Sequence, residues 1–392
     1  MKKIVALLCA VVILIASNIF FIRLIDDNYC DNVGAIFSDD KYKSMVMQGE
    51  ALDRNDTLLM YGASYLTQDI KSPFSADSLF ANKRDGFQVF TVGGAGYDPL
   101  VLVLNFGALA SRMSGHKVVF FITTFLGGDN LTSFEAKSSK EMFYGLMFNP
   151  VVDNSNKQAI CQQMIAISRQ KGQIQTDDFK DILYFSELYS SSKMVNKIEF
   201  ALLIPYYRME YYLLGVKDEL EAYTLLKADK NKVKYIVPQS ENIDWNNEMA
   251  IAVSAAKKNE TNNPFGMTNS NYNKIKDSLG KLKGSSKKWS YIPGVEYDNL
   301  NMIVQICKDN NIAPLFIIMP VNGKYYDYLG YKQSERQKYY RSVKDLVTGY
   351  GFDVADLSTH EYEDYFFNDA VHQDYKGWVY VDEAIDRYYH QS

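Results

Sequence analysis

The sequence contains few cysteines and no excess of positive charge, and each shortage excludes a class of protein. Its four cysteines are widely spaced, and one of them lies in an apolar N-terminal run; they are Cys9, Cys30, Cys161 and Cys307. This pattern fits neither a disulfide framework nor a zinc site. The 42 Lys and Arg residues are outnumbered by 47 Asp and Glu, which gives a formal net charge of −5. Such a chain lacks the broad basic surface that binds nucleic acid, so we expect no nucleic-acid partner.

The longest uncharged run lies at the N-terminus, over residues 4–22. As a helix it would be about 28 Å long, close to the thickness of the hydrocarbon core of a bilayer. Lys2 and Lys3 precede the run, whereas acidic residues follow it closely. By the positive-inside tendency, the N-terminus is then cytoplasmic and the rest is outside. We therefore expect a single-pass transmembrane anchor over residues 1–25 and an extracytoplasmic domain over residues 26–392.

A cleaved signal peptide is the alternative for this segment, because such peptides also begin with basic residues. The apolar run continues through Phe20, Phe21 and Ile22, beyond the small-residue pair Ala16-Ser17, and leaves no polar cleavage region. Cys9 lies too early and lacks the preceding small residue of a lipoprotein signal. These features favour a retained anchor.

Short apolar runs that alternate with amphipathic segments predict the fold of the remaining chain. Buried strands are expected at residues 57–61, 88–92, 118–122, 315–319 and 352–355. Helices are expected at residues 100–112, 300–310, 335–350 and 376–389. Strands and helices in this order favour an α/β fold with a mainly parallel sheet flanked by helices.

The composition changes over residues 141–290, approximately, to segments rich in Tyr, Lys, Asn and Ser. Helical periodicity recurs there, for example at residues 200–214 and 218–226. We interpret this region as a helical insertion in the sheet domain.

A serine stands where the first predicted strand ends, in Gly62-Ala-Ser64. Open α/β folds bind ligands at the carboxyl ends of their strands, where exposed N–H groups can stabilise an oxyanion. The residue two positions after Ser64 is Leu66, so the Gly-x-Ser-x-Gly elbow of α/β-hydrolases is absent. A serine after a glycine is also a common helix cap or turn residue, and this structural role stays an alternative.

The other candidate residues lie near the C-terminus, in Asn368-Asp-Ala-Val-His372. A serine that transfers acyl groups needs a base to take its proton and a carboxylate to orient that base. We assign Ser64 as nucleophile, His372 as base and Asp369 as orienting carboxylate; the alternative is a surface pair with Asp369 as a helix cap. A serine after the first strand with a C-terminal Asp-x-x-His is the layout of SGNH-type hydrolases and transferases. One Asp and one His do not fill a divalent coordination shell, so we expect no metal.

Glycines follow the second predicted strand, in Val92-Gly-Gly-Ala-Gly-Tyr97. Glycine lets the backbone approach a reacting carbonyl closely, so Gly94 or Gly96 could donate an N–H group to an oxyanion. The spacing of these glycines fits neither the dinucleotide-binding nor the Walker pattern, which argues against a phosphate loop.

Several longer segments resemble the DltD family of D-alanyl-lipoteichoic acid biosynthesis proteins. The resemblance is most specific at residues 316–328, 351–358 and 368–382, and it extends to residues 62–66, 263–266 and 281–291. It implies an SGNH-hydrolase-like domain outside the membrane that esterifies teichoic acid. We expect no cofactor. The implied partners are a membrane-bound O-acyltransferase, a D-alanyl carrier protein and the polymer. Ser64, Asp369 and His372 fall on the family's Ser, Asp and His.

One segment departs from the family pattern. After the third strand the family usually has Ser-Pro-Gln-Trp, whereas this chain has Thr123-Thr-Phe-Leu126. Because the amide donor is missing, the oxyanion would depend on backbone N–H groups or on the hydroxyl of Thr124.

Three other functions remain open from the sequence. The first is a thioesterase that hydrolyses a mischarged D-alanyl carrier protein, although an extracytoplasmic domain could not reach a cytoplasmic carrier. The second is a scaffold without catalytic activity that docks the acyltransferase. The third is a polysaccharide O-acetyl esterase or transferase of the same fold.

Overall fold

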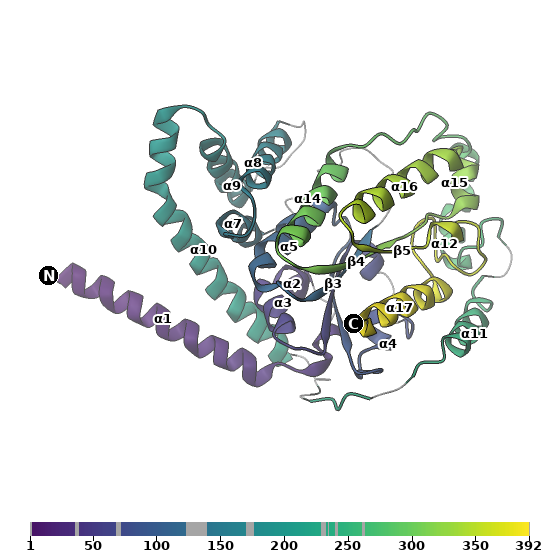
Figure 1. Ribbon diagram of the computed structural model, residues 1–392, viewed down its shortest axis with the longest axis horizontal. Helices are drawn as coiled ribbons and strands as arrows, with labels where there is room; N and C mark the ends of the chain where they lie inside the picture. Colours follow the sequence, from purple (N-terminus) through teal and green to yellow (C-terminus); the bar gives the residue numbers. More distant parts are fainter. Residues whose placement is uncertain are drawn as a thin grey trace.

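The computed structural model describes residues 2–35, 39–67, 72–122, 139–169, 176–228, 233, 235–239, 242–260 and 263–391. At its centre lies a parallel sheet of five strands (Figure 1). The strands are β1 (Thr57–Gly62), β2 (Gln88–Gly93), β3 (Lys117–Ile122), β4 (Ala313–Ile318) and β5 (Asp353–Asp356). The predictions of an α/β fold and of a mainly parallel sheet are therefore confirmed.

The spatial order of the strands is β2-β1-β3-β4-β5. The chain moves outward from β1 to β2, then returns past β1 to β3, so the direction of winding reverses between β1 and β3. Doubly wound sheets of this order bind ligands at the carboxyl ends of the strands, at the point of reversal. Ser64 follows β1 directly and therefore lies at this point.

Helices cover both faces of the sheet. Right-handed crossovers place α5 (Pro99–Leu109), α14 (Val295–Asp309) and α16 (Gln333–Gly349) on one face. Helix α14 contacts both α5 and α16, in agreement with this placement. On the other face, α17 (Tyr375–His390) packs against α4 (Ala76–Leu79) and α11 (Trp245–Ala256) (Figure 1). Every residue of α5 is buried, which explains its almost continuous apolar sequence.

Further helices stand between β3 and β4 in the chain. They are α7 (Lys140–Phe148), α8 (Asn154–Ser168), α9 (Asp177–Tyr189), α10 (Met194–Ala228), α11, α12 (Asn269–Ile275) and α13 (Leu279–Leu282). The two predicted stretches at residues 200–214 and 218–226 are one continuous helix, α10, with Pro205 inside it. Helix α10 packs against α1, α3 (Met45–Leu52), α7 and α9, and this packing outweighs the weak helix propensity of Gly215.

The first helix, α1, runs from Lys2 to Asn28 beside α10 (Figure 1). Among the helices of the described residues, none combines the length and the hydropathy that crossing a membrane requires. The anchor over residues 1–25 stays a prediction.

Two hydrophobic clusters hold the described part of the chain together. The larger one joins the sheet to the helices on its faces. The smaller one consists of Phe265, Met267, Val321, Tyr325, Tyr326, Leu329 and Tyr331, around α15 (Gly323–Leu329). Ala370 and Val371, from the loop between Asp369 and His372, pack against this smaller cluster. The described cysteines, Cys30, Cys161 and Cys307, are buried.

Candidate active site

Two strands that end side by side position Ser64. Gly62, the last residue of β1, pairs with Gly93, the last residue of β2. A Cβ atom on Gly93 would lie 2.5 Å from the carbonyl oxygen of Gly62, so only glycine permits this approach. Ser64 then begins a short 3₁₀ turn, in which the N–H of Leu66 donates to the carbonyl of Ala63 at 3.0 Å.

The three residues predicted to act together form one hydrogen-bonded chain. The Oγ atom of Ser64 lies 2.8 Å from Nε2 of His372. The Nδ1 atom of His372 lies 2.8 Å from Oδ2 of Asp369. Both distances are those of normal hydrogen bonds. The fold thus brings Ser64, from the end of β1, to a loop that precedes the last helix.

The carboxylate of Asp369 fixes the shape of its own loop as well as the imidazole. Its Oδ1 atom accepts hydrogen bonds from the backbone N–H groups of Val371 and His372, each at 2.8 Å. Burial raises the pKa of Asp369, but the hydrogen bonds and charge interaction with His372 outweigh it and hold this pKa below its usual range. Asp369 is therefore ionised at neutral pH, where it favours the His372 tautomer with a proton on Nδ1. In that tautomer Nε2 is free to accept the proton of Ser64.

The imidazole of His372 is enclosed by its neighbours, with 10% of its side chain exposed. The ring of Tyr65 lies against it at a centroid distance of 4.8 Å. The side-chain amide of Gln373 donates to the carbonyl of Tyr65 at 3.4 Å, which ties the turn after β1 to the histidine loop. Tyr65 and Gln373 lie in the family-like segments 62–66 and 368–382, next to Ser64 and His372, but the sequence assigned neither of them a role.

Asn322 holds the loop between Asp369 and His372 in place, and it was not among the residues predicted for the site. It is buried, and its backbone N–H donates to the carbonyl of Ala370 at 2.9 Å. Its side-chain amide donates to the carbonyls of Phe265 at 3.0 Å and Asp369 at 3.5 Å. Its Oδ1 atom caps α15 by accepting from the N–H of Tyr325 at 3.1 Å. Asn322 lies three residues after the fourth predicted strand, inside the family-like segment 316–328, but the sequence assigned it no role.

Of the three predicted oxyanion donors, Gly94 and Gly96 belong to the described residues. The loop that carries Gly94 and Gly96 leaves the sheet beside the turn of Ser64, because Gly62 and Gly93 are paired. Gly94 is buried, whereas Gly96 is exposed and has a φ of +77°, which favours glycine. Thr124 lies outside the described residues. The roles of all three as oxyanion donors stay predictions.

A pocket of about 330 Å³ opens beside the carboxylate. Its walls include Asp369, Val371, Tyr325, Met267 and Lys274. Apolar side chains and a few polar groups thus border one member of the hydrogen-bonded chain, which is the usual composition of a small-molecule site.

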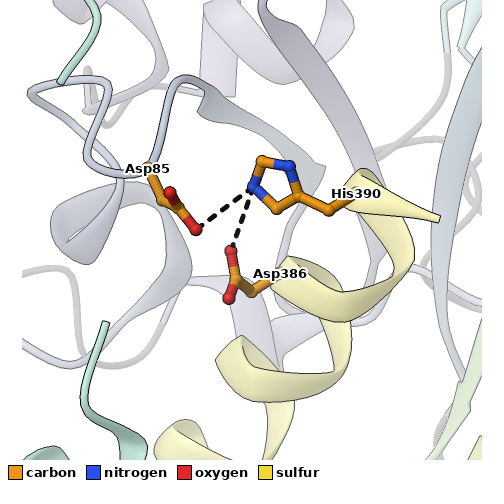
Figure 2. A group of neighbouring side chains, drawn as sticks. All are labelled: Asp85, Asp386 and His390. Atoms are coloured by element: carbon orange, nitrogen blue, oxygen red, sulfur yellow. Dashed lines mark ion pairs between the residues drawn. The ribbon is translucent and has the colours of Figure 1, made fainter. Parts of the chain in front are cut away.

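Possible metal ligands gather elsewhere in the described part of the chain. Nε2 of His390 lies 3.2 Å from Oδ2 of Asp85 and 3.6 Å from Oδ1 of Asp386 (Figure 2). Asp386 and His390 belong to the C-terminal end of α17, whose 16 residues extend about 24 Å. The loop of His372 lies at the opposite end of this helix, so this cluster is separate from Ser64. Independence from metal at Ser64 stays a prediction.

Comparison with known proteins gives a consistent result. The family model described as "DltD protein" matches residues 35–390. The chain is 31% identical over 351 residues to Protein DltD of Bacillus subtilis (strain 168), which covers 89% of this chain and 86% of that protein. It is 22% identical over 388 residues to Protein DltD of Staphylococcus aureus (strain NCTC 8325 / PS 47), which covers 96% and 92%.

Proposed function

Because this chain belongs to the DltD family, we propose that it transfers D-alanyl groups to teichoic acid, with Ser64 as the nucleophile. The observation that carries this proposal is the hydrogen-bonded chain from Asp369 through His372 to Ser64. A serine hydroxyl is a weak nucleophile until an adjacent base removes its proton, and here the base is itself oriented by a carboxylate. The position of Ser64 at the point where the sheet reverses its winding adds further support.

The reaction has two balanced halves. In the first, Nε2 of His372 takes the proton of Ser64 while Oγ attacks the carbonyl carbon of the donor. The bond from this carbon to the leaving group breaks, and His372 returns the proton to that group. In the second half, His372 takes the proton of a polymer hydroxyl, which attacks the D-alanyl ester on Ser64. Ser64 leaves with the proton from His372, and the ionised Asp369 stabilises the imidazolium in both halves.

Each half passes through a tetrahedral intermediate whose oxygen carries negative charge. We assign its stabilisation to the backbone N–H groups of Gly94 and Gly96 and to the hydroxyl of Thr124. Donors of this kind stabilise the transition state more than the ground state and therefore raise kcat.

We place the catalytic domain outside the cell membrane, with α1 as the anchor and the N-terminus in the cytoplasm. In support of membrane contact, α10 lies beside α1 and exposes large apolar side chains over its first half. These side chains include Met194, Val195, Ile198, Leu202 and Met209. Exposed apolar surface of this extent marks contact with a membrane or a partner. A membrane-bound O-acyltransferase would deliver the D-alanyl group, which a D-alanyl carrier protein supplies on the cytoplasmic side.

The decisive experiment detects the covalent intermediate. The full chain is incubated in membranes with its D-alanyl donor system, and the peptide that contains Ser64 is examined by mass spectrometry. We expect a D-alanyl ester on Ser64, and none in a Ser64→Ala chain. An acetyl ester would instead favour the O-acetyl transferase. Normal D-alanylation by the Ser64→Ala chain would exclude catalysis by Ser64 and favour a scaffold without catalytic activity.

A further inference from the structure

The segment from Lys257 to Lys288 is strongly basic, although the chain as a whole is acidic. It contains eight lysines and two acids, a net charge of +6, in a chain whose net charge is −5. All eight lysines are exposed: Lys257, Lys258, Lys274, Lys276, Lys281, Lys283, Lys287 and Lys288. Within the part of the chain that the structure describes, no carboxylate forms an ion pair with any of them. Their charge is therefore available to a ligand.

An apolar stripe holds this segment against the candidate active site. Tyr272, Ile275, Leu279 and Leu282 follow one another at three- and four-residue spacing and pack against the smaller hydrophobic cluster. The same cluster receives Val371 from the loop between Asp369 and His372. One face of the segment is buried in this way, whereas its lysines are exposed to solvent.

Hydrogen bonds fix the segment to the residue that precedes Asp369. The hydroxyl of Thr268 donates to Oδ1 of Asn368 at 3.0 Å, and the amide of Asn271 donates to the same atom at 2.8 Å. The backbone N–H of Thr268 donates to the carbonyl of Asn368 at 3.0 Å. The start of α12 is thus held in a fixed position relative to the catalytic loop.

Helix α12 borders two pockets, and Lys274 and Asn271 line both of them. One is the 330 Å³ pocket beside Asp369. The other has a volume of about 580 Å³ and is lined mainly by polar side chains, including Lys258 and Asn259. Two adjacent pockets that share a lysine fit a ligand with repeated anionic groups better than a single small anion.

The carboxyl side chains at these two pockets do not neutralise the positive charge of the lysines. Asp369 is engaged by His372 and by two backbone N–H groups. Asp374, in the larger pocket, lies beside Glu260, and burial followed by this contact raises the pKa of Glu260 well above its usual range. Burial likewise raises the pKa of Asp374. Two neighbouring carboxyls with raised pKa values retain a proton between them, which lowers the negative charge of the wall.

We propose that the two pockets lined by α12 bind successive phosphodiester groups of the acceptor polymer, with Lys258 and Lys274 neutralising the phosphates. This inference rests on the proposed function, because it takes the polymer as the acceptor. Lys274, next to Asp369, holds one phosphate near the catalytic loop, and the adjoining polyol presents its hydroxyl toward Ser64. Lysine suits this task as a mobile point charge that can follow a flexible polymer. The basic segment is therefore a recognition element for polyol phosphates.

The test measures binding directly, with the full chain carrying Ser64→Ala in detergent, so that no acyl transfer is needed. The probe is synthetic, unacylated poly(glycerol phosphate). We expect Lys258→Glu/Lys274→Glu to weaken binding at least about tenfold, because two favourable contacts become repulsive. Lys274→Arg should retain the affinity. The matched control is Lys193→Glu/Lys197→Glu, which makes the same charge change at exposed lysines near the start of α10 and should alter affinity less than about twofold.

Two results would overturn the proposal. Equal weakening by the control pair would mean that only overall charge attracts the polymer. Displacement of the probe by soluble dihexanoylphosphatidylglycerol, at equal phosphate concentration, would assign the lysines to lipid headgroups instead. Failure of the proposed function is distinguishable from both results. A chain that binds the probe through these lysines but forms no ester on Ser64 keeps the binding site and loses only the catalytic assignment.

Discussion

Nε2 of His372 lies 2.8 Å from Oγ of Ser64, although the two residues are 308 positions apart in the chain. The contact depends on three features of the fold: the end of β1, the loop before α17, and the carboxylate of Asp369 that orients the ring. Substitutions can change each of these features separately.

The hydrogen-bonded residues should behave as one unit. We expect Ser64→Ala and His372→Ala each to lower D-alanyl transfer at least about a thousandfold, with the double variant no worse than either single one. Asp369→Asn should be milder, because it keeps the shape of the loop but loses the negative charge. The measurement is ester-linked D-alanine on teichoic acid in cells with equal amounts of each variant. Additive losses would contradict a shared mechanism.

The topology follows from the two N-terminal lysines and the uncharged run over residues 4–22. In intact cells stripped of their wall, added protease should digest the domain that follows α1. A matched sample with permeabilised membranes shows that the protease is active against cytoplasmic proteins. Protection of the domain until the membrane is broken would reverse the orientation and favour the thioesterase.

The carboxyl pair of Glu260 and Asp374 should make stability fall as the pH rises. The pKa of Glu260 is raised in the folded chain, first by burial and then by Asp374, so folding retains a proton that the unfolded chain releases above about pH 4.3. The stabilisation that this group contributes is then complete below this pH and is lost as the pH rises toward the raised pKa of the folded chain. Glu260→Gln removes the titration but keeps the shape. In urea unfolding, the free energy of unfolding of the variant should rise relative to that of the native chain from pH 5 to about pH 8. An unchanged difference between the two free energies over this range would contradict the prediction.

Asn322 should act as a positioning residue for the loop of Asp369. Asn322→Ala leaves the buried carbonyl of Phe265 without its donor and removes the cap of α15, which should cost about 1–3 kcal/mol of unfolding free energy. The same variant should lower kcat more than it raises KM, because the loop shifts while the polymer site remains. Asn322→Ser separates the two effects, since serine can still cap the helix but lacks the amide donor. A loss of stability without a change in kcat would limit Asn322 to a structural role.

Local patterns in the sequence determined much of the fold. Buried strands in a parallel sheet are short continuous apolar runs, so residues 57–61, 88–92 and 118–122 were recognisable without the structure. The helix at α10 was predicted as two pieces, because local propensity at Gly215 does not report the packing of α10 against its neighbours. Order along the chain also indicated which Asp and His belong with Ser64, since only four histidines were available.

The tertiary structure alone decided how these residues meet and what surrounds them. The sequence does not contain the strand order β2-β1-β3-β4-β5, which places Ser64 where the winding reverses. The sequence assigned no role to Asn322, Tyr65 or Gln373, because their contacts arise only when distant segments pack together. The lysines of residues 257–288 likewise gained a role only from the structure, because the net charge of the whole chain is negative. Charge and composition are sums over the chain, whereas a binding site depends on which side chains the fold brings to one place.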